Sequence, residues 1–171
     1  MLIIAPFYFG YGIIIYMIKT NAMRILDKNN VEYKTYSYDS SKAISGVEVA
    51  KSLNQNPEYV FKTLVTVAKS KNHYVFLVPV EKELDLKKAA LSVGEKSVEM
   101  LKQKDLFNLT GYVHGGCSPL GMKKNFTTVI DISAKEQPII IFSAGKIGYQ
   151  IQTTLQQLKT AINFILADIT I

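Results

Sequence analysis

The chain has 171 residues, enough for one domain with a substantial core. With 48% hydrophobic and 20% charged residues, its composition excludes an intrinsically disordered protein. A single cysteine excludes an internal disulfide, and two histidines far apart in the sequence give no ligand set for a structural zinc. The net charge of +6 favours a polyanionic partner such as a nucleic acid.

Residues 1–18 form an uncharged, apolar run that just reaches the length of a membrane-spanning segment. Pro6, Gly10 and Gly12 interrupt the run, no Lys or Arg precedes it, and no A-x-A-like cleavage site follows it. We therefore interpret residues 1–16 as an upstream apolar extension or a wrongly chosen start, before a domain at residues 17–171. A membrane anchor is the alternative interpretation.

Helical and strand patterns alternate through the rest of the chain. Helices are expected where a polar cap precedes apolar residues at helical spacing, at residues 21–28, 46–54, 85–94, 102–109 and 154–166. Strands are expected in runs rich in β-branched and aromatic residues, at residues 31–38, 61–68, 73–80, 127–132 and 138–144. KSKN joins two of these strands into a predicted hairpin. The elements together predict a mixed α/β domain.

Four of the predicted helices have a recognisable inward face. The residues expected to be buried on them are Ala22, Ile25 and Leu26, then Val47, Ala50 and Leu53, then Leu86, Ala89 and Ala90, and finally Leu155, Leu158, Ile162 and Ile165.

The segment TGYVHGGCSPLGMKK, residues 110–124, is richer in glycine than a simple connection needs. Cys117 is a nucleophile if His114 activates it, but this spacing inside a glycine-rich loop fixes no geometry, so a spectator thiol is the favoured interpretation. Gly115 and Gly116 permit positive φ and close approach of a ligand to the backbone. A ligand cradle and a tight turn before Pro119 explain this pair equally well.

Lys62 lies near the start of an apolar strand and has two interpretations. Such a lysine is usually on the solvated face of a strand. Alternation also places Lys62 on the same face as Leu64, so that its ammonium emerges at the edge of a partly apolar cavity and binds an anion.

Six ordered segments resemble the YbaK/EbsC family of aminoacyl-tRNA deacylases, which is related to the editing domain of bacterial prolyl-tRNA synthetases. They are KTNAMRIL, VFKTLV, LDLKKAA, KSVEM, TGYVHGGCSPLGMKK and FSAGKIG, and the likeness runs from about Met17 to Ile169. The resemblance implies a mixed α/β fold, with one compact YbaK-like domain in which helices surround a mixed, partly barrel-like β-sheet.

The resemblance also implies an activity, which is trans-editing of mischarged aminoacyl-tRNA, above all Cys-tRNA(Pro), by a cytoplasmic deacylase. The thiol of the substrate cysteine would attack its own ester, so no cofactor and no metal are expected. The implied partners are the acceptor end of aminoacylated tRNA and prolyl-tRNA synthetase in a transient complex, without stable membrane association. The alternative is a non-catalytic or regulatory aminoacyl-tRNA-binding protein of the EbsC type.

The family's site residues are carried over position by position. The catalytic positions fall on Lys62, Gly115 and Tyr36, and the substrate-binding positions fall on Thr63, Gly116, Cys117, Ser118, Ser143, Gln150 and Ser45. Ser45 stands where phenylalanine is frequent and Gln150 where an acid occurs, which puts amino-acid specificity in question more than the reaction. Four lysines are expected to contact the tRNA backbone: Lys87, Lys88, Lys123 and Lys124.

Overall fold

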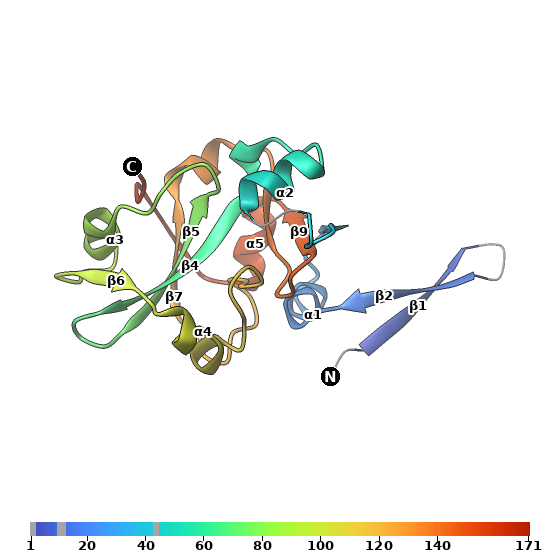
Figure 1. Cartoon of the computed structure of the whole chain (residues 1–171), viewed down its shortest axis with the longest axis horizontal. Coiled ribbons are helices and arrows are strands. Elements are labelled where there is room, and N and C mark those ends of the chain that lie inside the picture. The colour runs from blue at the N-terminus through green and yellow to red at the C-terminus, as the bar shows by residue number, and fades with distance from the viewer. Residues whose placement is uncertain (1–2, 10–12, 43–44) are drawn as a thin grey trace.

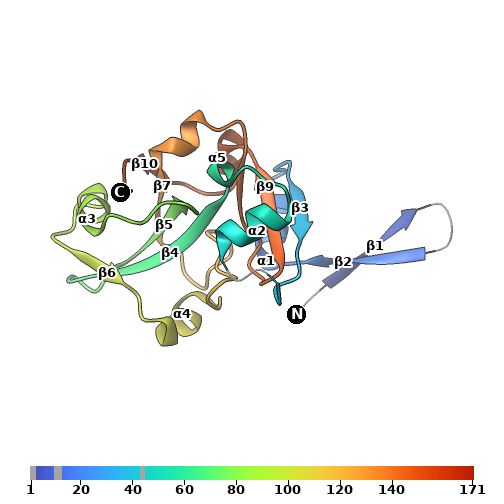
Figure 2. The same cartoon turned by 45° about the horizontal axis from the view of Figure 1, so that its top comes forward.

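The computed structural model describes residues 3–9, 13–42 and 45–171. Helices and strands alternate along them and build the expected mixed α/β domain, with a five-stranded and a three-stranded sheet in its body (Figure 1). A third, two-stranded sheet is formed by β1 (Ile3–Phe9) and β2 (Ile13–Lys19), and it extends away from the body (Figure 2).

The larger sheet is mixed, as expected. Its strands, in spatial order, are β10 (Ile165–Ala167), β7 (Thr127–Asp131), β5 (His73–Pro79), β4 (Phe61–Ala68) and β6 (Val98–Met100). The predicted hairpin is confirmed, because β4 and β5 pair in antiparallel register with Lys62 opposite Val78. β7 pairs in parallel with both β5 and β10.

The smaller sheet is antiparallel and lies next to the beginning of β4. It consists of β3 (Lys34–Ser37), β9 (Tyr149–Thr153) and β8 (Ile140–Ser143), in that order. A single parallel bridge between Val60 and Ile141 joins it to the chain just before β4. Among the described residues the pairing gives two open sheets joined at this bridge, without closure into a barrel.

The five α-helices lie where the sequence predicts helices, and two of them begin at the expected caps. They are α1 (Asn21–Lys28), α2 (Gly46–Ser52), α3 (Leu86–Ser92), α4 (Gln103–Thr110) and α5 (Leu155–Ala161), with 3-10 turns η1 (Pro57–Tyr59) and η2 (Ile132–Glu136). The Thr20 hydroxyl accepts from Met23 N–H at the start of α1, and Asp85 caps α3. The main core lies between α1, α5 and the two sheets, where Met23, Leu77 and Phe142 are fully buried.

Several expected details are wrong. The last helix ends at Ala161, and Ile165 belongs to a short strand in which its side chain is 42% exposed. Leu86 is 39% exposed, since α3 turns only its alanines inward. In α2 the buried side chains are Val49 and Ala50. Strands β6, β9 and β10 were not predicted. β6 and β10 have three residues each and pair with strands distant in the sequence, and β9 pairs with both β3 and β8.

Met17, the expected start of the domain, lies within β2. No helix in the described ranges is long and apolar enough to span a membrane.

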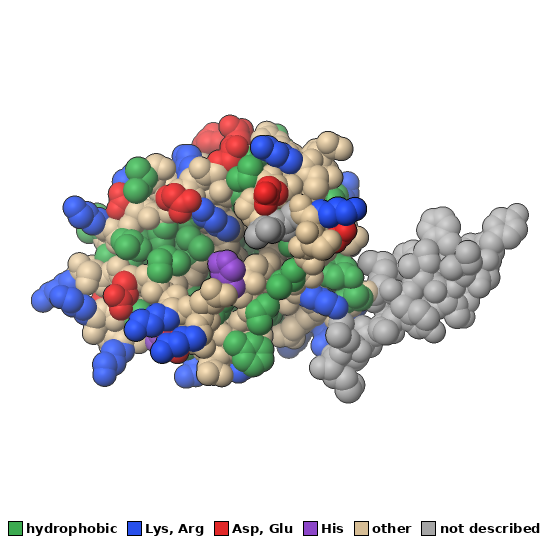
Figure 3. Space-filling view, in the orientation of Figure 1, with side chains coloured by type: hydrophobic (Ala, Val, Ile, Leu, Met, Phe, Trp, Pro, Cys, Tyr) green, Lys and Arg blue, Asp and Glu red, His purple; other side chains and the backbone are tan. Residues whose placement is uncertain are grey.

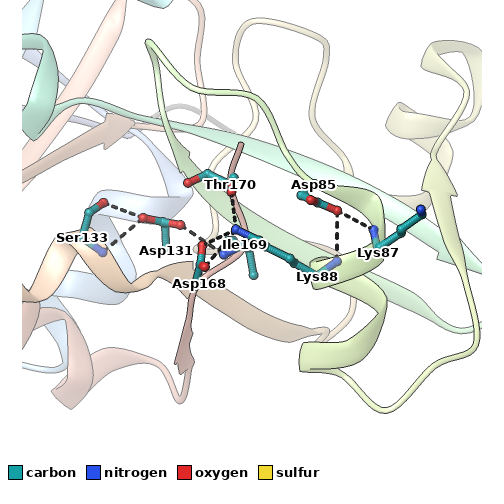
Figure 4. A network of polar contacts seen from close by, with 8 residues as sticks. All are labelled: Asp85, Lys87, Lys88, Asp131, Ser133, Asp168, Ile169 and Thr170. Atoms are coloured by element: carbon teal, nitrogen blue, oxygen red, sulfur yellow. Dashed lines mark hydrogen bonds and ion pairs between the residues drawn. The ribbon is translucent and has the colours of Figure 1, made fainter.

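The C-terminal segment is held to α3 and β7 by the polar network in Figure 4. The ammonium of Lys88 lies 2.8 Å from Asp168 Oδ2 and also donates to the carbonyl of Thr170. Asp131 accepts from Ile169 N–H through one carboxylate oxygen and from Ser133 through the other. Lys88, one of the lysines expected to contact tRNA, also holds the end of the chain through this network, and its side chain is 40% exposed.

Candidate active site

A cavity of about 430 Å³ opens where the beginning of β4 meets the end of β8, the start of β9, the start of α2 and the glycine-rich loop. The Val60–Ile141 bridge explains the meeting, because it brings the beginning of β4 next to β8. The cavity collects seven of the ten residues expected from the sequence: Ser45, Lys62, Thr63, Gly115, Cys117, Ser143 and Gln150. Tyr36, Gly116 and Ser118 do not line it.

Lys62 is the sole Lys or Arg among the described residues that line the cavity. It stands on a part of β4 whose outer edge is free, since β6 pairs with β4 only from Thr66 to Ala68. Its ammonium lies 2.9 Å from the carboxylate of Glu83. Glu83 is 79% exposed and Lys62 is 27% exposed, so the charge of Lys62 is at the rim of the cavity, where it is available to an anion.

Tyr112 fixes the shape of the glycine-rich loop. Its ring is buried, and its hydroxyl donates to the carbonyl of Leu120 across the loop. Gly121 has φ +76, and a Cβ on it would lie 2.8 Å from the Tyr112 hydroxyl. Asn21 at the start of α1 donates to the Gly121 carbonyl at 3.1 Å. The loop is therefore braced from the core and from α1.

Gly115 and Gly116, at the centre of this loop, have different structural roles. Gly115 has φ +82, which strains any residue with a Cβ, and it lines the cavity. Gly116 packs against the turn after β8, where an added Cβ would lie 3.0 Å from the backbone nitrogen of Ile147. In the part of the chain that the structure describes, the N–H groups of Gly115 and Cys117 have no acceptor. Both residues line the cavity, so their N–H groups are candidate donors to a ligand bound there.

Cys117 lines the cavity but is poorly suited to act as a nucleophile. Its side chain is 7% exposed, and burial raises the pKa of its thiol to about 12. Burial and the neighbouring Cys117 likewise raise the pKa of Tyr112 to about 12. The thiol therefore stays protonated at neutral pH, whereas the attacking species in cysteine chemistry is the thiolate. His114 lines the same cavity, and no hydrogen bond joins it to Cys117.

Tyr36 and Ser118 do not line the cavity, and both hydroxyls are engaged in hydrogen bonds. The hydroxyl of Tyr36 donates to Gln152 at 2.6 Å and ties β3 to β9. Tyr38, two residues later and therefore on the same side of the chain, lines the cavity. Ser118 is fully buried, and its hydroxyl accepts from the N–H of Leu120 within the loop.

The two positions that depart from the family pattern both line the cavity. Ser45 caps α2: its hydroxyl accepts from Glu48 N–H at 3.2 Å, and its own N–H donates to the Glu48 carboxylate. Gln150 is 6% exposed and accepts from the side-chain amide of Gln55 at 2.9 Å. A small cap and a neutral amide therefore stand at the two positions where the resemblance implies phenylalanine or an acid.

Thr63 lines the cavity and carries an unpaired polar atom. Its hydroxyl is buried and has no hydrogen-bond partner among the described residues. A buried hydroxyl normally has a partner, so Thr63 is a candidate contact for a bound ligand. Ser143 also lines the cavity, and its hydroxyl accepts from Gly145 N–H.

One wall of the cavity could not be found from sequence patterns. It is made by the segment from the end of β6 into α4, with Met100, Leu101, Gln103 and Leu106. The sequence of this segment is typical of an ordinary amphipathic helix and the residues that precede it. Only its position against β4 makes it part of a site.

Comparison with known proteins identifies the family. The model of the aminoacyl-tRNA editing domain matches residues 42–161. The chain belongs to this family. All seven expected residues that line the cavity fall within the matched part of the editing domain.

Relatives of this editing domain include a curated protein of Enterococcus faecalis named "Putative Cys-tRNA(Pro)/Cys-tRNA(Cys) deacylase EbsC". It is 45% identical over 153 residues, which are 89% of this chain and 93% of that protein. Among solved structures, a protein described as "a putative trans-editing enzyme for prolyl tRNA synthetase" has a TM-score of 0.77 at 22% identity, over 91% of this chain and 99% of that one. A hypothetical protein has a TM-score of 0.81 at 18% identity, over 89% of this chain and 100% of that one. The structural likenesses show the YbaK-like fold.

Proposed function

We propose that this protein hydrolyses mischarged aminoacyl-tRNA in trans, with Cys-tRNA(Pro) as its substrate. The observation that carries the proposal is a cavity that combines one lysine at its rim with free backbone N–H groups and a buried, protonated cysteine. An aminoacyl ester is already activated, so orientation and oriented dipoles suffice to accelerate its breakdown. The name of the Enterococcus faecalis relative supports the same substrate.

Five of the residues expected from the sequence have a role in this proposal. Lys62 binds the phosphate or sugar of the terminal nucleotide, and the free N–H of Gly115 polarises the ester carbonyl. Thr63 offers its unpaired hydroxyl to the aminoacyl group, and Gln150 forms part of the wall around it. Tyr36 supports this wall by holding β9 through its hydrogen bond to Gln152.

The nucleophile in this proposal belongs to the substrate. The thiol sulfur of the cysteinyl group attacks its own carbonyl carbon, the ester bond to the ribose oxygen breaks, and the thiol proton passes to that oxygen. The products are a cyclic thioester of cysteine, which water then opens, and free tRNA. The protein contributes a cavity of about 430 Å³ that holds the reacting groups together.

The proposed substrate places the protein in the cytoplasm, and prolyl-tRNA synthetase is the proposed transient partner because it produces such mischarged tRNA. We assign this function to residues 17–171. The described lining of the cavity begins at Tyr38, which supports that assignment.

Replacing Cys117 by alanine should leave kcat/KM for Cys-tRNA(Pro) within a few-fold of the wild-type value. A spectator contributes packing alone, whereas removal of a nucleophile costs on the order of 10⁴-fold or more. Single-turnover deacylation at pH 7 measures the effect, with circular dichroism as the check on folding. A loss of about a thousandfold or more would make the thiol the nucleophile.

Replacing Glu83 by glutamine should lower KM for Cys-tRNA(Pro) and leave kcat unchanged. Glu83 competes with the substrate for Lys62, and an exposed ion pair of this kind is worth about 0.2–1 kcal/mol, which corresponds to at most about a fivefold change. Glu81→Gln is the matched control, since it removes the same charge from an exposed neighbour. An equal change of KM in both variants would contradict competition between Glu83 and the substrate for Lys62. A higher KM for Glu83→Gln would contradict it as well.

The function is tested with a panel of mischarged tRNAs, by measuring binding and turnover for each. The proposal expects turnover of Cys-tRNA(Pro) above all others. Tight binding across the panel without turnover would instead support the non-catalytic, regulatory role.

A further inference from the structure

Helix α4 connects the cavity to an exposed aromatic ring. Gln103 and Leu106 line the cavity, and Phe107 is 55% exposed on the same helix. Because residues four apart lie on the same face of a helix, Phe107 shares a stripe with Gln103. Side chains of a helix lean toward its N-terminus, so the ring of Phe107 leans toward the end of α4 that borders the cavity.

A lysine is held against this ring. The ammonium of Lys123 lies 5.0 Å from the centroid of the Phe107 ring. Lys123 is fixed by its own N–H, which donates to Thr110 at 3.0 Å, and by its ammonium, which reaches the carbonyl of Asn108. The end of the glycine-rich loop therefore brings a positive charge to the outer face of α4.

Further positive charge flanks the start of α4. Lys102 and Lys104 are exposed, and across the described ranges neither they nor Lys123 form an ion pair with a carboxylate. Figure 3 shows Lys and Arg side chains gathered at the lower left of this face, over β6 and α4, beside hydrophobic side chains. Asp105 is the single acidic residue of α4. The surface thus combines an exposed ring with unpaired positive charge.

We propose that this outer face of α4, formed by Phe107 with Lys102, Lys104 and Lys123, binds the unpaired 3′-terminal nucleotides of the tRNA. A base stacks on Phe107, and the lysines contact the phosphates between the bases. Aromatic rings beside basic side chains are the general means by which proteins bind single-stranded nucleic acid. The face leads directly to the cavity, so a strand stacked on it would deliver its terminal ester there. This inference rests on the proposed function.

The test is direct binding of uncharged tRNA(Pro), compared with the same tRNA lacking its three terminal nucleotides. Phe107→Ala should weaken binding of the intact tRNA by roughly tenfold, as expected for the loss of one stacked base, and should not change binding of the shortened tRNA. Phe107→Tyr should bind as the wild type does. Leu91→Ala is the control, because Leu91 is an exposed apolar residue on a different helix, 82% exposed.

Three outcomes would overturn the inference. They are wild-type affinity in Phe107→Ala, equal weakening for the intact and shortened tRNA, and a change of oligomeric state in Phe107→Ala during sedimentation, which would assign the face to a second copy of the chain. Because binding is measured with uncharged tRNA, it is independent of catalysis. Absence of turnover with this binding pattern would refute the proposed function and leave the stacking face in place.

Discussion

Replacing Lys62 by alanine should lower kcat/KM for Cys-tRNA(Pro) by about 10²–10³, the loss that follows removal of one preorganised electrostatic contact. Lys62 is the sole Lys or Arg among the described residues around the cavity, so none of these neighbours can take over its charge. The fold should be little affected, since the one ion pair of Lys62 is made with the exposed carboxylate of Glu83.

Single-turnover deacylation at saturating protein separates chemistry from binding for this variant. Lys82→Ala is a matched control, because it removes an exposed lysine next to Glu83 in the sequence. Lys62→Arg keeps the positive charge but replaces the ammonium by a planar guanidinium, and this variant should retain part of the activity that Lys62→Ala loses. A wild-type rate of deacylation by Lys62→Ala would contradict a role of Lys62 in the reaction.

The second large effect concerns the substrate. Ser-tRNA(Pro) should bind with nearly the affinity of Cys-tRNA(Pro), because the two side chains are almost the same shape and such a cavity separates similar groups by only about 1–3 kcal/mol per methylene. Its clearance should be slower by on the order of a hundredfold or more, since a hydroxyl is a far weaker nucleophile than a thiol.

Rates at saturating protein, measured for cysteinyl, seryl and alanyl esters on the same tRNA, check this prediction. The alanyl ester is the control without an internal nucleophile, and it should be no faster than the seryl ester. Equal clearance of all three would contradict attack by the substrate thiol. It would indicate attack by water instead, in a cavity whose specificity had changed at Ser45 and Gln150.

The parts of the fold that local chemistry decides could be predicted from the sequence. Thr20 and Asp85 cap helices as expected, and the β4–β5 hairpin follows from its β-branched and aromatic residues around KSKN. The strand Tyr149–Thr153 was not predicted, although it forms a local hairpin with β8 in which Ser143 lies opposite Gln150. Its other partner, β3, lies more than a hundred residues earlier in the chain, and no local sequence pattern indicates that pairing.

In the candidate site, too, some features could be predicted from local sequence and others depend on distant parts of the chain. The edge position of Lys62 followed from the alternation of β4, and the glycines of the loop indicated a special backbone. Glu83 could not be predicted as the partner of Lys62. Its place depends on the C-terminus, where Ile171 N–H donates to the Glu83 carbonyl and Leu84 pairs with Thr170.

The most direct measurement is the release of cysteine from Cys-tRNA(Pro) supplied in large excess over the purified protein. We expect each molecule of wild-type protein to clear many molecules of substrate, with Cys117→Ala close to it and Lys62→Ala strongly impaired. Release of no more than one equivalent, despite tight binding of the tRNA, would contradict catalysis and make this editing domain a binding protein.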